Sequence, residues 1–463
     1  RTVHRQIRKT THLHCPLASS PYPAYIRFMA ADDLDPERNR LSARIGRVAQ
    51  VGASLAGAAA NAGAQSLFGG DNAQKQIAAA LRAALGANKG PPMKVAQMLS
   101  TVPDFLPPEY AEELSQLQTN APAMGWPFVS RRMRAELGPD WETKFKSFER
   151  SAAAAASLGQ VHRAESPDGQ KLACKLQYPD MASAVEADIG QLQTLLGVFR
   201  RFGQVIDPTE IGEEIAERLR EELDYEREAK HIGLYSQMLA DEPGIRTPGT
   251  IPDLCTKRLL TMTWLDGAPL AAFVDSDQEI RNRLTELLFK AWWQPFARYG
   301  IIHGDPHLGN YAFAEDGKIL NLLDFGCVRV FPPSFVSGVV ALWRALKADD
   351  RAGIEAAYRI WGFKNLSPGA VDALTIWARF IYAPLIDDRV RTTADGVSPA
   401  EYGRREAWAV KEALKLHGPV TIPREFVFMD RAAIGLGAAF LRLRAELNFH
   451  DLFAAAKIGR AHV

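Results

Sequence analysis

The 463-residue sequence has few cysteines, no long apolar run and almost no net charge, and each absence excludes a class of protein. Its four cysteines lack the Cys-x-x-Cys spacing of zinc sites and are too scattered for a disulfide framework, so we expect a reducing compartment. No run of about eighteen apolar residues occurs, which argues against a membrane-spanning helix. The net charge of +1 gives no basic excess, so no nucleic-acid partner is expected.

Acidic side chains are also absent from residues 1–28, which contain arginines, a lysine and three histidines. This composition is typical of a mitochondrial transit peptide, but the segment shows no convincing amphipathic helix. The simpler interpretation is that Met29 starts the native chain and that residues 1–28 are upstream sequence outside the fold. We therefore expect a cytoplasmic protein, or a mitochondrial one if the basic segment is a genuine transit peptide.

The most informative motifs lie in the second half of the chain, between apolar runs that predict strands. Residues 301–310 read Ile-Ile-His-Gly-Asp-Pro-His-Leu-Gly-Asn, and residues 322–326 read Leu-Leu-Asp-Phe-Gly. This order and spacing are typical of the catalytic loop and metal-binding turn of a kinase-like phosphoryl transferase. Such chemistry needs a carboxylate that orients the attacking hydroxyl or water, and two oxygen ligands that hold Mg²⁺ against the phosphates. We assign Asp305 to the first role, and Asn310 and Asp324 to the second.

A β-hairpin is predicted upstream of these motifs. Residues 158–165 have the composition of a strand, Ser-Pro-Asp-Gly at 166–169 is a turn signal, and residues 171–177 make the returning strand. A kinase carries its phosphate-covering loop and its nucleotide-binding lysine on such a hairpin. Lys175 is therefore our candidate for that lysine.

Residues 207–238 predict a helix whose middle is dense in acidic side chains. Asp224 and Glu228 lie four residues apart on one helix face, with Glu222 close by, and such a density needs a cation partner. The candidate cations are Lys94 and Lys175.

The next strand leads toward the catalytic motif. Residues 258–264 predict a strand that resembles the last strand of a kinase small lobe, where backbone groups meet adenine, and we assign Met262 and Trp264 to this contact. A Ser-x-x-Glu capping box at 276–279 predicts the start of a helix that ends at Gly300.

Taken in order, these motifs resemble one family. They are Lys-Val-Ala-Gln at 94–97, the alanine-rich segment 154–157, Lys175, Glu-Leu-Asp at 222–224, Glu228 and the motifs around Asp305 and Asp324. The ensemble resembles the atypical kinases that include UbiB, AarF and the mitochondrial Coq and ADCK proteins, over about residues 89–330. The resemblance implies an α+β, bilobal protein-kinase-like fold, with an N-terminal helical extension packed over the active site and a mainly helical C-terminal lobe.

The resemblance also implies a division of the chain. Beyond the leader at 1–28, residues 29–140 would form the helical extension and residues 141–267 a small lobe with a helical insert. Residues 268–463 would form the large lobe and the C-terminal helices.

In this family an alanine-rich loop replaces the glycine-rich loop over the phosphates. Its residues here are Ala154, Ala155, Ala156 and Ser157. Each Cβ limits how closely the backbone amides approach the phosphates, so nucleotide preference is expected to differ from that of ordinary kinases.

The resemblance further implies that a helix bearing a Lys-x-Gly-Gln motif covers the cleft and restricts access. Lys94 and Gln97 are the matching residues, and Ala96 replaces the motif glycine. Lys94 is expected to meet Glu222 and Asp224. Lys175 is expected to pair with Glu228.

Three functions remain open from the sequence. The first is an atypical kinase or ATPase that uses ATP and Mg²⁺ and supports ubiquinone or other lipid metabolism. Its partners would be ATP or ADP, a small-molecule or lipid acceptor such as a quinone precursor, and the surface of a membrane. The second is a phosphotransferase of the aminoglycoside or choline kinase type, and the third is a nucleotide-binding scaffold without turnover. Protein phosphorylation is not expected, because no Ala-Pro-Glu element follows Gly326.

Overall fold

An antiparallel sheet and a series of helices make up the part of the chain that the computed structural model describes. The described residues are 124–156, 158–200, 209–364, 366–394, 396–398, 401–417 and 420–455. All of them belong to a single unit, Gly57–Val463. The predicted leader, most of the predicted extension, Lys94, Gln97 and Ser157 lie outside the described residues.

The sheet has five strands, all paired antiparallel. They are β1 (Ser147–Phe148), β2 (Ala154–Ala156), β3 (Gly159–Glu165), β4 (Lys171–Gln177) and β6 (Leu259–Thr263). The order is β1-β3-β4-β6, and β2 also pairs with β3. The predicted hairpin is confirmed as β3 and β4, with Val161 opposite Lys175. Its turn depends on Gly169, whose φ of +89° suits glycine.

A small apolar core lies between this sheet and α6 (Trp126–Leu137). Val129 and Met133 of α6 are completely buried, and so are Cys174 and Leu176 of β4. The ring of Trp141 packs at right angles to that of Phe148 on β1, with centroids 5.2 Å apart. The core thus fixes the sheet that carries Lys175.

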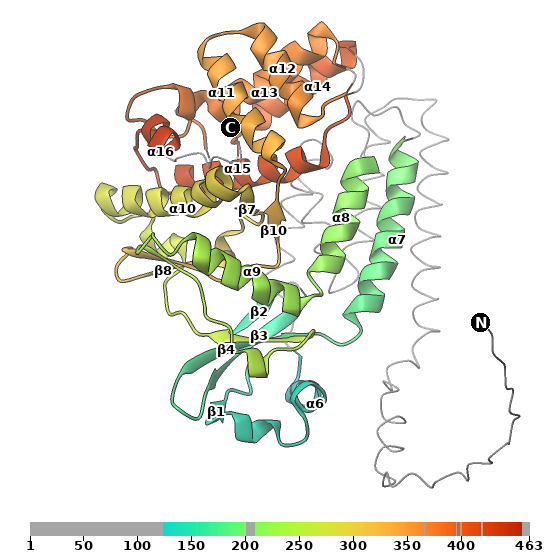
Figure 1. The fold of residues 1–463 in the computed structure, drawn as a ribbon, viewed down its shortest axis with the longest axis vertical. Coiled ribbons are helices and arrows are strands. Elements are labelled where there is room, and N and C mark those ends of the chain that lie inside the picture. The colour runs from blue at the N-terminus through green and yellow to red at the C-terminus, as the bar shows by residue number, and fades with distance from the viewer. Residues whose placement is uncertain are drawn as a thin grey trace, which may run out of the picture. The chain divides into compact units, whose positions relative to one another are not determined.

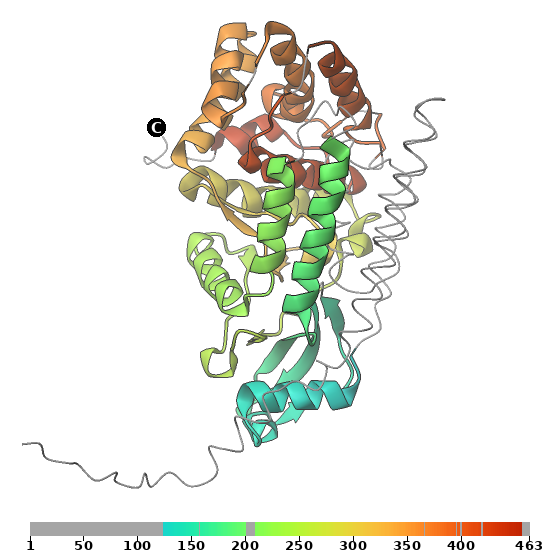
Figure 2. The ribbon, with the colours of Figure 1, turned by 90° about the vertical axis from the view of Figure 1, so that its right-hand side faces the viewer.

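Three helices follow β4. These are α7 (Met181–Arg200), α8 (Thr209–Glu221) and α9 (Tyr225–Met238), and α7 and α8 run side by side (Figures 1 and 2). The prediction of one helix through residues 222–224 is wrong. Asp224 caps α9 instead, because its side chain accepts a hydrogen bond from the Arg227 backbone N–H at 3.0 Å, and aspartate favours such caps over helix interiors.

Helix α10 (Gln278–Tyr299) leads into the catalytic motif. The predicted capping box is wrong, because the helix starts after Asp277 and no side chain caps it. Its end is as predicted. Gly300 has a φ of +70° and its N–H donates to the Phe296 carbonyl at 2.8 Å, which is a typical glycine stop.

Two small sheets carry the motifs. One pairs β7 (Ile301–His303) with β10 (Val328–Val330), and the other orders β5 (Ile245–Arg246), β9 (Ile319–Leu322) and β8 (Tyr311–Ala314). The candidate metal turn therefore lies between β9 and β10. Short 3₁₀ turns occupy Trp141–Lys144, Pro252–Leu254, Leu270–Phe273 and Leu308–Asn310.

The rest of the described chain is helical. Its helices are α11 (Pro333–Lys347), α12 (Arg351–Trp361), α13 (Pro368–Ile386), α14 (Arg404–His417), α15 (Arg424–Arg442) and α16 (Phe449–Ala455). One extensive apolar core joins them to α10 and continues through α9, which lies between the five-stranded sheet and these helices (Figure 1).

Among the described residues, one helix is long and apolar enough to cross a membrane by length and composition alone, namely α13. Buried core helices meet the same criterion. Its Val371, Leu374 and Tyr382 belong to the main core, and the Tyr382 hydroxyl donates to the Val339 carbonyl of α11 at 3.2 Å. One face of α13 thus packs into the main core, and 39% of its apolar window is buried.

Candidate active site

The site centres on one lysine held between two carboxylates. Lys175 Nζ of β4 lies 2.8 Å and 2.9 Å from the two carboxylate oxygens of Glu228 on α9. It also lies 2.9 Å from Oδ2 of Asp324, in the turn after β9. The expected pairing of Lys175 with Glu228 is therefore present. Three elements far apart in the sequence meet at this point.

Burial and charge set the protonation of this group. Burial opposes the charge of Lys175, but the carboxylates of Asp324 and Glu228 raise its pKa well above the ordinary value. The pKa of Glu228 is raised, mainly by burial and also by the charge of Asp324, against the lowering effect of Lys175. One cation thus faces two acidic groups, and this favours the arrival of a further cation.

A second cluster surrounds Asp305. The Asn310 side-chain amide donates to Asp305 Oδ2 at 3.1 Å, and the guanidinium of Arg431 on α15 lies 2.7 Å from Oδ1. Asp305 and Arg431 are both buried, with relative exposures of 7% and 6%. Arg431 was not predicted. The sequence signal for it was weak, an Asp-Arg pair within the apolar middle of α15.

Aromatic rings connect the two clusters. The ring of Phe325 lies 5.4 Å from that of Tyr235 on α9 and 5.5 Å from that of His303, between ring centroids. His303 Nε2 also forms a short hydrogen bond with the Asp324 backbone carbonyl. Because Phe325 and Tyr235 are completely buried, these contacts fix the turn that carries Asp324.

The alanine-rich segment is a strand for its described part, where a loop was expected. Ala154, Ala155 and Ala156 form β2 and pair with Val161, Gln160 and Gly159 of β3, respectively. Ala154 and Ala155 are exposed, and Ala156 is partly exposed. The covering of phosphates by this hairpin stays a prediction.

The expected adenine contacts lie at the end of β6. Met262 is buried opposite Ala173 of β4. The Trp264 backbone N–H donates to the Lys171 carbonyl at 2.9 Å, so the sheet already uses this donor. Any adenine contact at Trp264 must therefore involve its carbonyl or its ring. This assignment stays a prediction.

The proposed partners of Lys94 lie where α8 and α9 meet. Glu222 lies close to the Asp-Phe-Gly turn, since a Cβ on Gly326 would be 3.8 Å from its Cγ. Asp224 is exposed and caps α9. Lys94 itself lies outside the described residues, so the contact is untested.

The residues present fit Mg²⁺, which prefers carboxylate and amide oxygens. Asp324 Oδ1 accepts the Gly326 N–H at 2.9 Å and Oδ2 faces Lys175, an arrangement that fixes the carboxylate in orientation. Asn310 donates through its amide nitrogen to Asp305, so its amide oxygen is the atom suited to a metal.

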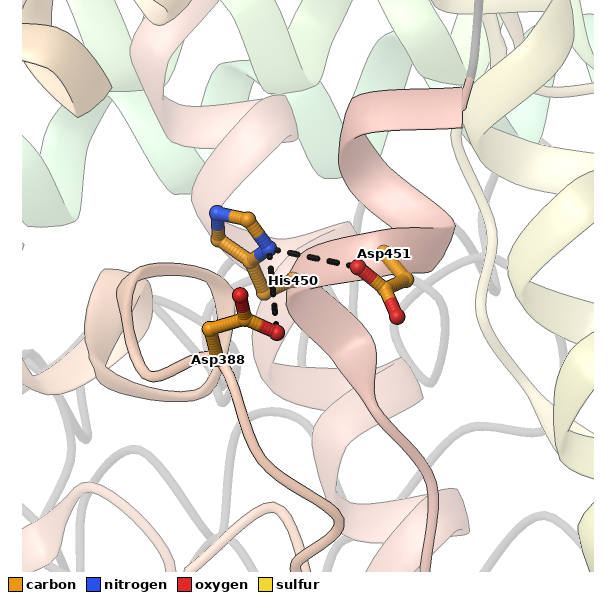
Figure 3. Close-up of side chains that lie close together, drawn as sticks. All are labelled: Asp388, His450 and Asp451. Carbon is orange, nitrogen blue, oxygen red and sulfur yellow. Dashed lines mark hydrogen bonds and ion pairs between the residues drawn. The ribbon is translucent and has the colours of Figure 1, made fainter.

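A separate group of possible metal ligands lies on the surface, at Asp388, His450 and Asp451 (Figure 3). The side chains of this group already form hydrogen bonds with neighbouring protein groups. His450 Nε2 lies 3.0 Å from Lys347 Nζ, and the Asn448 amide nitrogen is 2.8 Å from both aspartates. When Nε2 accepts from Lys347, Nδ1 carries the proton and faces the carboxylates, so it is not free to bind a metal.

Comparison with known protein families identifies the family of this chain. The family model described as "ABC1 atypical kinase-like domain" matches residues 116–358, about half of the chain. The chain belongs to this family. The ABC1 match includes both clusters except Arg431, and it supports a protein-kinase-like fold with mixed helix and sheet content.

Curated relatives agree with the ABC1 assignment. The chain is 32% identical over 268 residues to "Atypical kinase COQ8, mitochondrial" of Saccharomyces cerevisiae, which is 57% of this chain and 53% of the relative. It is 28% identical over 372 residues to "Atypical kinase COQ8B, mitochondrial" of Rattus norvegicus, which is 79% of this chain and 69% of the relative. The matched part is about half the length of several such relatives.

A solved structure is also similar to this chain. The complex of Rv3197 with erythromycin from Mycobacterium tuberculosis matches with a TM-score of 0.56 and 26% identity, over 84% of this chain and 97% of that one. Its 84% coverage of this chain is larger than that of the family model, so the similarity is not confined to residues 116–358.

Proposed function

We propose that this ABC1 protein is an atypical kinase or ATPase of the UbiB type, which binds ATP with Mg²⁺ and transfers or hydrolyses the terminal phosphate. The observation that carries the proposal is the contact of Lys175 with both Glu228 and Asp324. A lysine oriented by a helix carboxylate, next to the aspartate of an Asp-Phe-Gly turn, is the arrangement that kinases use for nucleotide phosphates.

Each residue then has a distinct task. Lys175 would bind phosphate oxygens, Glu228 would hold Lys175 in position, and Asn310 and Asp324 would hold Mg²⁺. When bound, Mg²⁺ neutralises charge on the phosphates. Asp305 would orient the attacking hydroxyl or water, for which its two hydrogen-bonded oxygens give a fixed direction.

The finer architecture belongs to the same proposal. The five-stranded sheet with α9 would act as the small lobe, and α10 with the later helices as the large lobe, with the nucleotide between them. The segment around Lys94 and Gln97 would cover the cleft and restrict access. This supports a small-molecule or lipid acceptor over a protein substrate.

The names of the relatives suggest a context. COQ8 and COQ8B are named as mitochondrial atypical kinases. We propose by this likeness a role in isoprenoid-quinone, particularly ubiquinone, or other lipid metabolism. Quinone precursors would accept the phosphate, or their synthesis would depend on ATP hydrolysis by this protein. Contact with a membrane would be peripheral. A mitochondrial location would follow if the basic leader is a transit peptide.

An aminoglycoside or choline kinase type of enzyme is the second candidate, because it would use the same Asp305, Asn310 and Asp324. The ABC1 match favours the first candidate. A scaffold without turnover is the third, and the retention of Lys175 and Glu228 in contact argues against it.

Nucleotide binding with and without Mg²⁺ tests the proposal. The protein should bind ATP and ADP in a Mg²⁺-dependent manner and release phosphate from ATP. Phosphate release is measured both in the presence and in the absence of lipid vesicles and quinone-precursor phenols. Asp324→Asn should abolish the Mg²⁺ dependence, because the substitution removes a charged metal ligand. Asp241→Asn, at an exposed aspartate in the turn after α9, is the matched control. Equal affinities with and without Mg²⁺ in all three proteins would refute the proposal.

A further inference from the structure

Helix α15 reaches the catalytic loop at two successive turns. Arg431 lies 2.7 Å from Asp305 Oδ1. Four residues later, Gly435 faces Pro306 so closely that a Cβ on this glycine would lie 2.4 Å from the proline Cγ. Residues 431 and 435 share one face of the helix, so that face is fitted to the loop at Asp305 and Pro306.

The contact is buried as well as close. The side chains of Arg431 and Asp305 have relative exposures of 6% and 10%, so little water competes for either charge. Next to Arg431, Asp430 accepts a hydrogen bond from the Trp377 indole, which ties α15 to α13. This bond holds the backbone that carries Arg431 in place relative to α13.

The two oxygens of Asp305 have different partners. Arg431 contacts Oδ1, and Asn310 donates to Oδ2 at 3.1 Å. A carboxylate with a hydrogen-bonded partner on each oxygen is fixed in orientation. A fixed orientation suits a group that must direct a hydroxyl or water.

We propose that Arg431, which lies beyond the residues matched by the ABC1 model, is a positioning residue that holds Asp305 correctly oriented for phosphoryl transfer. The inference rests on the proposed function, since it gives Asp305 a role in the reaction. Arg431 acts through Asp305 and needs no contact with the nucleotide.

Turnover compared with nucleotide affinity separates this role from a merely structural one. Arg431→Met should lower the rate of ATP turnover on the order of 100-fold, because a misplaced catalytic group can cost that much, and leave nucleotide affinity within about twofold. Arg431→Lys keeps the positive charge but loses the planar guanidinium, so it should recover part of the lost turnover.

Arg442→Met is the matched control, at an exposed arginine on the same helix. It should leave turnover and nucleotide affinity unchanged. If Arg431→Met matches Arg442→Met in turnover, the inference is overturned.

Combination with Asp305→Asn keeps the test decisive if Arg431→Met folds poorly. The single variant leaves a buried carboxylate that has lost the charge of Arg431, whereas the double variant carries neither charge and should unfold at higher urea than Arg431→Met. In the Asp305→Asn background, Arg431→Met should cause no further loss of residual turnover. A full additional loss there would show that Arg431 does not act through Asp305.

The two proposals fail in distinguishable ways. Wild-type protein without Mg²⁺-dependent binding and turnover would overturn the proposed function, and with it the role of Arg431. An active wild type whose turnover is insensitive to Arg431→Met would overturn only the role of Arg431.

Discussion

Lys175 Nζ lies 2.9 Å from Oδ2 of Asp324, so the candidate phosphate-binding cation and a candidate metal ligand are in direct contact. Glu228 contacts the same ammonium group. The three side chains together carry one positive and two negative charges when all are ionised. This imbalance makes the site dependent on Lys175 for its stability as well as for its chemistry.

The first prediction concerns Lys175→Met. The substitution removes the cation that contacts both Asp324 and Glu228, and Glu228 is only 3% exposed. Breaking a buried pair in this way costs about 3–5 kcal/mol in the free energy of unfolding. Urea denaturation followed by circular dichroism measures the difference.

A matched control lies on the same strand. Lys171 pairs with Asp266 at 3.0 Å, but both side chains are at least 70% exposed. Lys171→Met should therefore change the free energy of unfolding by no more than about 1 kcal/mol. Equal losses for the two variants would contradict the view that burial makes the Lys175 cluster important.

The second prediction concerns pH and Asp430. Burial raises the pKa of Asp430 to about 7, against the lowering effect of its hydrogen bond from Trp377. The folded protein keeps the Asp430 carboxyl protonated up to about pH 7, whereas the unfolded chain releases the same proton near pH 4. The stability that Asp430 contributes is therefore fully present below pH 4. As the pH rises to about 7, the free energy of unfolding falls by roughly 4 kcal/mol.

Asp430→Asn should remove this dependence, since the amide oxygen can still accept from Trp377. The variant should gain stability relative to the wild type between pH 4 and pH 8. Asp372→Asn, at an exposed aspartate on α13, should not. Unfolding free energies for Asp430→Asn and wild type that stay parallel across this range would show that Asp430 does not titrate as described.

The third prediction concerns Lys94, which lies outside the described residues. If its segment gates the cleft through Glu222 and Asp224, Lys94→Ala should change the rate of ATP turnover. Removal of the residues before Met93 should leave nucleotide binding largely intact. Hydrolysis rates identical to wild type for Lys94→Ala would refute the gating role.

Local signals explain what the sequence could predict. The β3–β4 hairpin has a short turn with Gly169, and the helix stop at Gly300 depends on one residue's φ, so both could be predicted from neighbouring residues. The placement of Asp305 and Asn310 in one cluster follows from their separation by only five residues.

The features that the sequence could not predict depend on contacts between residues far apart in the chain. Arg431 is 126 residues from Asp305, and no local pattern specifies that pairing. The break between α8 and α9 was missed for a different reason. Asp224 has two options, helix interior or N-cap, and the acidic density around it favoured the helical interpretation.

The dependence of Asp305 on α15 has a consequence for synthesis on the ribosome. At about 5–20 residues per second, the counter-ion at position 431 is made roughly 6–25 s after the aspartate it neutralises. Through that interval the loop cannot bury its carboxylate at low cost. The nascent chain should therefore remain without its finished catalytic centre until its last helices have emerged, a delay that would keep incomplete chains inactive.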